Sequence, residues 1–147
     1  MPDFDLERYV RAQDPVIAQV LSELRNGEKR SHWMWFVFPQ IAGLGLSETA
    51  RFYALSGLAE ARAYLAHPVL GSRLAECTAA MLGWAGKRDL VFILGPIDAL
   101  KFASSMTLFE AAGGGDLFTR AIAAFCDGLR DNKTLALLAG EGQKPPR

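Results

Sequence analysis

The sequence predicts a single compact domain that is mainly α-helical, with room for one or two short strands. The chain has 147 residues, a length typical of one domain. Apolar residues recur at steps of three and four in several segments, which is the spacing of one helix face. Glycine and proline separate these segments. We expect the domain to cover residues 1–140 and a disordered tail to follow over residues 141–147.

The helices can be placed from their apolar stripes and from the residues at their ends. Asp14, Ser47 and Asn132 have side chains that can cap a helix N-terminus, and Gly27 suits a helix end. The expected helices run over about 5–10, 14–26, 47–53, 56–65, 68–84, 96–112, 116–126 and 132–138. The short run Leu90–Leu94, rich in branched and aromatic residues, is the best strand candidate.

The segment from His32 to Gln40 is the expected centre of the core. It holds two of the three tryptophans and ends in Pro39-Gln40. Burying one large aromatic side chain contributes roughly 1.5–3 kcal/mol. Periodicity does not decide between a buried strand and a short buried helix. The polar residues at its two ends, His32 and Gln40, mark where a pocket could open.

Charge and composition exclude several classes of function. Sixteen basic residues balance sixteen acidic ones, which gives no support for nucleic-acid binding. There is no apolar run of membrane-spanning length and no signal peptide, so we expect a cytoplasmic protein that does not enter a membrane. Cys77 and Cys126 are expected to be reduced, buried thiols. Two histidines without paired cysteines or carboxylates predict neither a metal site nor a cofactor.

The segment from Asp98 to Phe109 is the most informative about function. Its apolar positions form one helical stripe, and Asp98, Lys101 and Ser105 border that stripe. One interpretation is a structural pair between Asp98 and Lys101 that anchors the core. The other places these side chains at the rim of a pocket for a polar or anionic small molecule.

Under the second interpretation, the ligand-binding residues form two walls. His32, Trp33 and Gln40 form one wall, and Lys101 and Ser105 form the other beside Asp98. The catalytic candidates, should hydrolysis occur, are Asp98, Glu48 and His32. Each also has a structural interpretation. Asp98 can pair with Lys101, Glu48 suits the first turn of its helix, and His32 can simply be solvated.

Three motifs together resemble one known family. They are Ser31–Gln40, Leu65–Gly71 and Asp98–Phe109, within a likeness that extends from about Phe4 to Leu138. The family is number 1810 of the bacterial and fungal families of unknown function, whose members are sometimes mislabelled calpastatin. The resemblance implies a small helical cytoplasmic protein. It supplies no activity.

We therefore expect binding, and hydrolysis as an extension of it, of a small nucleotide-like or heterocyclic metabolite. The alternative is a non-catalytic module that binds a protein or forms a homodimer through its apolar surface.

Overall fold

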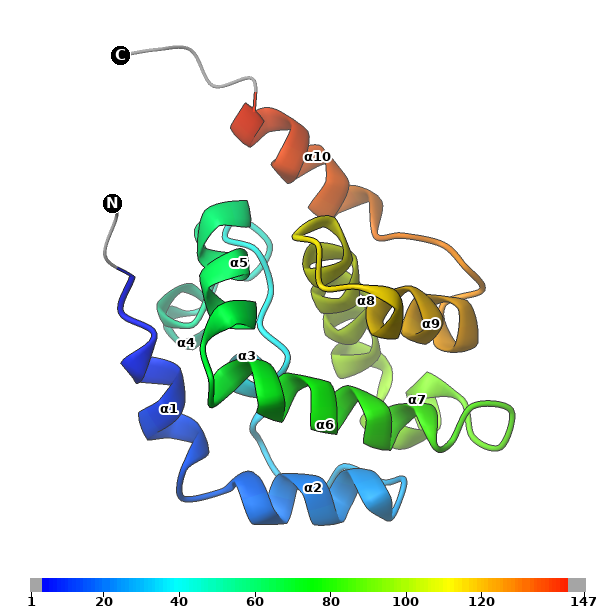
Figure 1. The fold of residues 1–147 in the computed structure, drawn as a ribbon. Coiled ribbons are helices and arrows are strands. Elements are labelled where there is room, and N and C mark those ends of the chain that lie inside the picture. The colour runs from blue at the N-terminus through cyan, green and yellow to red at the C-terminus, as the bar shows by residue number, and fades with distance from the viewer. Residues whose placement is uncertain (1–3, 143–147) are drawn as a thin grey trace.

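The computed structural model describes residues 4–142, and within them it contains ten helices and no sheet. The mainly α prediction is therefore confirmed. One isolated parallel bridge joins Ile41 to Leu55. The helices, shown in Figure 1, are α1 Glu7–Gln13, α2 Ile17–Arg25, α3 Met34–Val37, α4 Glu48–Phe52, α5 Leu58–Ala66, α6 Leu70–Leu82, α7 Leu90–Leu94, α8 Pro96–Ala111, α9 Asp116–Phe125 and α10 Asn132–Gly142.

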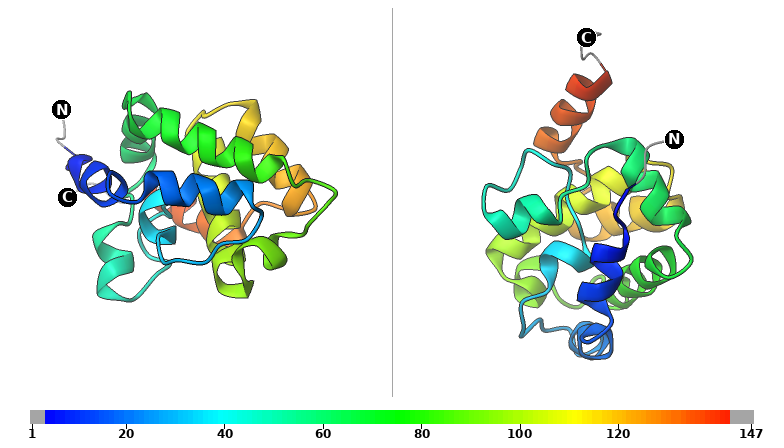
Figure 2. Two further views of the ribbon diagram at one scale, coloured as in Figure 1. Left: turned by 90° about the horizontal axis from the view of Figure 1, so that it is seen from below. Right: turned by 90° about the vertical axis from the view of Figure 1, so that its left-hand side faces the viewer.

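Helix α8 is the central element of the fold. It packs against α5, α7, α9 and α10, and Figure 1 shows it between α5 and α9. Its second half is buried on nearly every side, from Ser104 to Phe109, as expected of a helix enclosed by others. Helix α6 joins α5, α9 and α2. By contrast, α10 extends away from the other helices (Figure 2).

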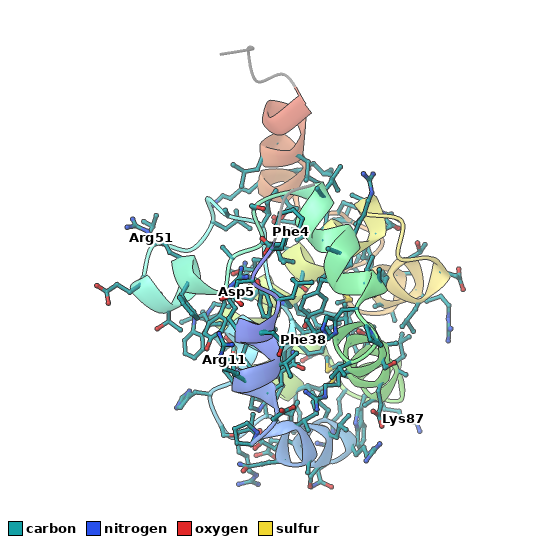
Figure 3. All side chains as sticks on the ribbon, turned by 60° about the vertical axis from the view of Figure 1, so that its left-hand side comes forward. Phe4, Asp5, Arg11, Phe38, Arg51 and Lys87 are labelled. Atoms are coloured by element: carbon teal, nitrogen blue, oxygen red, sulfur yellow. The ribbon has the colours of Figure 1, made fainter. Side chains whose placement is uncertain are left out.

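The aromatic segment forms a short helix and not a strand. Helix α3 makes a single turn, and Pro39 follows it. Phe38 meets Phe102 of α8 edge to face, with ring centroids 5.1 Å apart. Figure 3 shows Phe38 inside the shell of helices, whereas Arg51 and Lys87 lie at the periphery. The expectation that this segment is the centre of the core is confirmed, because Trp33, Met34, Val37 and Phe38 are all buried.

The expected strand at Leu90–Leu94 is wrong, because these residues form α7. Asp89 caps this helix by accepting a hydrogen bond from the Phe92 N–H at 2.8 Å, and Gly95 ends it in the left-handed region at φ 88°. Leu90, Ile93 and Leu94 are buried while Val91 and Phe92 are exposed, which is a helical spacing. A five-residue apolar run does not by itself distinguish the two structures.

Two of the three expected caps are also wrong. Ser47 does cap α4, through the Ala50 N–H. Asp14 instead pairs with Arg73, and α2 begins only at Ile17 with no side-chain cap. Asp131 rather than Asn132 accepts the bond from Thr134 N–H that caps α10. Gly27, at φ 69°, follows the end of α2 as expected.

The C-terminal end differs partly from expectation. Helix α10 continues to Gly142, so the first two positions of the expected tail are helical. Residues 143–147, the rest of that tail, lie outside the described part of the chain.

A buried carboxylate ties α2 to the aromatic segment. The Glu23 side chain accepts five hydrogen bonds. They come from Arg30 N, Ser31 N, Ser31 Oγ, Trp33 Nε1 and Gln19 Nε2, at 2.6–3.1 Å. Burial alone would raise the pKa of Glu23, but the hydrogen bonds together outweigh burial and hold this pKa at about 2. The ionised carboxylate is therefore the form that the fold requires.

Replacing Glu23→Gln is predicted to lower the free energy of unfolding at pH 7 by about 3 kcal/mol, the value of a pKa lowered from 4.5 to about 2. All five partners are donors, and the amide N–H groups of glutamine repel them. Because the folded-state pKa is lowered, the stabilisation is complete above pH 4.5 and is lost as the pH falls toward 2. Urea unfolding at several pH values measures it.

The matched control is Glu76→Gln, which removes an exposed ion pair with Arg25. It should change the free energy of unfolding by less than about 1 kcal/mol. Equal losses in the free energy of unfolding for the two variants would contradict this role of Glu23. So would a difference in that free energy between wild type and Glu23→Gln that does not narrow below pH 4.5.

Candidate functional site

Asp98 lies between two lysines rather than one. Lys29 Nζ is 2.9 Å from Asp98 Oδ2, and Lys101 Nζ is 3.7 Å from Oδ1. We call these three residues the ionic cluster. The expected pair between Asp98 and Lys101 is present, but the nearer partner is Lys29, which the sequence did not indicate. One surplus positive charge remains in the cluster.

The ionic cluster covers the aromatic segment. Lys29 Nζ lies 5.0 Å from the centroid of the Trp33 ring, and Lys101 Nζ lies at the same distance from that of Trp35. Both are cation–π contacts. The Lys29 backbone N–H also donates to the Ile93 carbonyl of α7 at 2.7 Å. The lysines therefore join the aromatic segment to α7 and α8, and they have protein partners already.

The remaining residues of the predicted site are separated. Trp33 is buried, and its indole N–H donates a hydrogen bond to the Glu23 carboxylate. Ser105 is fully buried, and its hydroxyl has no hydrogen-bond partner within residues 4–142. His32 and Glu48 are both exposed, Glu48 on the five-residue helix α4. The structure does not bring these side chains into one pocket.

Gln40 instead lines an open groove on another face of α8. The groove has a volume of about 850 Å³ and lies where α8, the loop after Gln40 and the start of α10 meet. Four leucines form its apolar walls, and most of its polar groups come from residues 130–133, where the loop after α9 leads into α10. The lining residues are Gln40, Leu44, Leu100, Ala103, Ser104, Gly128, Leu129, Arg130, Asp131, Asn132, Lys133 and Leu135.

The periodicity of α8 explains why the predicted site divides. Residues advance by about 100° around a helix axis. Leu100, Ala103 and Ser104 therefore share one face, and this face borders the groove. Lys101 and Ser105 lie roughly 100–140° from Leu100 by the same geometry, and they face the aromatic segment and the core. Gln40 thus meets Ser104 of α8, and not Ser105.

The segment that closes the groove is held by polar contacts that sequence reasoning missed. Arg130 donates two hydrogen bonds to Glu110 of α8, at 2.8 and 2.6 Å. The Arg130 hydrogen bond lowers the pKa of Glu110, against the opposing effect of burial. Asp131 N–H donates to Thr107 Oγ1 at 2.9 Å. The available signal was Glu110, the one charged residue in the second half of α8.

Within residues 4–142, the structure shows no arrangement typical of a metal site, of a reactive cysteine at position 77 or of a membrane-spanning helix. Within residues 4–142, no cluster of three histidine, cysteine or carboxylate side chains is positioned to hold a metal ion. Cys77 is buried, and burial raises the pKa of its thiol to about 12, which disfavours the nucleophilic thiolate. None of the helices in that part of the chain combines the length and apolar character needed to cross a membrane.

Comparison with known proteins identifies the family. The fold and groove define a small all-helical domain. The chain belongs to the family described as "Protein of unknown function (DUF1810)", whose profile matches residues 3–138. It is similar to the crystal structure of the conserved hypothetical protein Rv1873 from Mycobacterium tuberculosis. The two share 50% sequence identity with a TM-score of 0.89, over 92% of this chain and 97% of the other. No protein of curated function matches the chain.

The unequal burial of the two lysines predicts unequal effects on stability. The Lys29 side chain is 8% exposed and that of Lys101 is 24% exposed. We expect Lys29→Met to lower the free energy of unfolding by about 2 kcal/mol, because Asp98 then loses its nearer partner. Lys101→Met, the matched control, should cost less than about 1 kcal/mol. Urea unfolding compares them, and an equal or larger cost for Lys101→Met would show that the second lysine anchors the cluster.

Proposed function

We propose that the groove between α8 and α10 binds a small heterocyclic or nucleotide-like metabolite. The observation that carries this proposal is the hydrogen bond from Gln40 Nε2 to Ser104 Oγ, at 2.7 Å, in a groove whose apolar walls are four leucines. Apolar walls with a few placed polar groups are typical of small-molecule sites. The leucines suit the two faces of a flat ring, and the polar groups suit its edge.

A positive charge at the rim of the groove favours a ligand whose ring carries an anionic substituent. Lys133 is exposed at the start of α10, and it forms no ion pair within residues 4–142. Arg130 is already paired with Glu110, and Asp131 Oδ2 is engaged with Thr134. Lys133 is therefore the lining cation available to a phosphate or carboxylate.

Binding is better supported than hydrolysis. Asp98 and Glu48, the two carboxylates expected to activate water, do not line the groove. Asp98 is held by Lys29, and Glu48 is exposed on α4. Asp131, which does line it, uses one carboxylate oxygen to cap α10. Binding, unlike hydrolysis, needs no carboxylate that activates water, so these positions do not weigh against it.

A thermal-shift screen with nucleobases, nucleosides, nucleotides and flavin precursors tests this function. A ligand at a hundred times its dissociation constant should stabilise the fold by about 2.7 kcal/mol. Leu100→Glu should weaken the binding of any hit at least tenfold, because it places a charge against the apolar ring face. Leu100 is 73% exposed, so the variant should fold normally.

Ile97→Glu is the matched control for this screen. Ile97 is 71% exposed and lies one helical turn from Leu100, yet it does not line the groove. Its substitution should leave ligand affinity unchanged. A screen without any stabilising ligand, or hits that respond equally to both substitutions, would refute binding in the groove.

A second candidate function is self-association through the same side of α8. Ile97, Leu100 and Leu129 are each more than 70% exposed, and contiguous exposed apolar side chains often mark an interface. A homodimer formed there should dissociate in Ile97→Glu, as measured by sedimentation velocity over a range of concentrations. A wild-type protein that is monomeric at every concentration would exclude it.

A further inference from the structure

The orientation of the Gln40 amide follows from the hydrogen bonds of Ser104. The Ser104 hydroxyl lies 3.0 Å from the Leu100 carbonyl and 3.2 Å from the Lys101 carbonyl, both one turn earlier in α8. These carbonyls only accept, so the single hydroxyl hydrogen points to them. Ser104 Oγ must then accept from Gln40, and the amide nitrogen must face it. Ser104 is therefore a positioning residue for Gln40.

The backbone on both sides of Gln40 is held as well. Pro39 precedes it and fixes one dihedral angle. The Gln40 carbonyl accepts a hydrogen bond from Leu55 N–H at 2.9 Å, and the next residue but one, Ala42, donates to the Leu55 carbonyl at 2.8 Å. The side chain thus projects from a fixed point and ends at a fixed hydroxyl. A side chain held at both ends is preorganised, since it has its binding conformation before the ligand arrives.

One donor and one acceptor of this amide remain for a ligand. Its nitrogen carries two hydrogens, of which Ser104 takes one. Within residues 4–142, no other group hydrogen-bonds the Gln40 side chain. Its oxygen is not among the buried unpartnered atoms of that part of the chain, so it keeps solvent-exposed surface, and Gln40 is a lining residue of the groove. The oxygen can accept from a ring N–H, and the N–H beside it can donate to the neighbouring ring acceptor when Ser104 takes the hydrogen that points away from the oxygen.

On the basis of the proposed function, we propose that Gln40 selects rings in which an N–H donor lies next to an acceptor. Cyclic amides and amino-substituted nitrogen heterocycles share this chemistry. A ring with acceptors alone leaves the Gln40 oxygen unpaired, and a site built to pair with a polar group rejects the analogue that lacks it. The leucine walls contact the ring faces and do not distinguish these ligands.

Matched ring pairs test this selection by ligand-observed NMR titration. The pairs are 2-pyridone with N-methyl-2-pyridone, 1-methyluracil with 1,3-dimethyluracil, and 9-methyladenine with its N6,N6-dimethyl derivative. In each pair the second member lacks the donor. Wild-type protein should bind the donor-bearing member roughly tenfold more tightly or better. Gln40→Leu, which removes the acceptor, should abolish this preference, whereas Gln40→Glu, which preserves the size of the side chain and its acceptor, should retain it.

Two further variants separate selection from simple affinity. Ser104→Ala releases the amide, so the preference should shrink while the ring still binds. Leu100→Ala should weaken both members of a pair equally and leave their ratio unchanged. A ratio near one in wild type, or a ratio that persists in Gln40→Leu, overturns the inference and leaves groove binding intact. Failure of every ring to bind overturns the proposed function together with it.

Discussion

The Glu23 carboxylate is the interaction on which the rest of the structure depends. It accepts hydrogen bonds from five donors, one on Gln19 of α2 and four on Arg30, Ser31 and Trp33, and so fixes the path of the chain from Arg30 to the aromatic segment. Lys29, the residue directly before this path, pairs with Asp98 near the start of α8. A buried charge is stable only when it is fully hydrogen-bonded. The position of the central helix is thus linked to one ionised group on a peripheral helix.

Helix α8 then presents different chemistry on its different faces. One face carries Asp98 and Lys101 against the aromatic segment, and another carries Leu100 and Ser104 to the groove. Its buried end holds the loop before α10, through Thr107 and Glu110. The central helix therefore contributes Leu100 and Ser104 to the groove and holds in place the neighbouring segment that supplies most of its other polar groups. This division explains why the ionic cluster stabilises the fold while the groove remains open.

Much of the fold could be predicted from the sequence, because apolar stripes of helical spacing decide where long helices form. The run Leu90–Leu94 could not, since five apolar residues fit either secondary structure. Gln40 lines the groove, and its role in ligand binding stays a prediction. Its partner is Ser104 and not Ser105, and one step along a helix changes the face by about 100°. Lys29 and the segment 128–133 reach their places through long-range contacts that no local pattern specifies.

The measurement that tests the account most directly is a ¹⁵N NMR titration of the protein with the ring that stabilises it most. The account predicts that the Gln40 side-chain amide and the backbone amides of residues 128–133 shift together. The indole signals of Trp33 and Trp35 should stay in place. Movement of these indole signals and of the Lys101 amide, with Gln40 unaffected, would contradict the account. It would place the ligand at the aromatic segment and the ionic cluster instead.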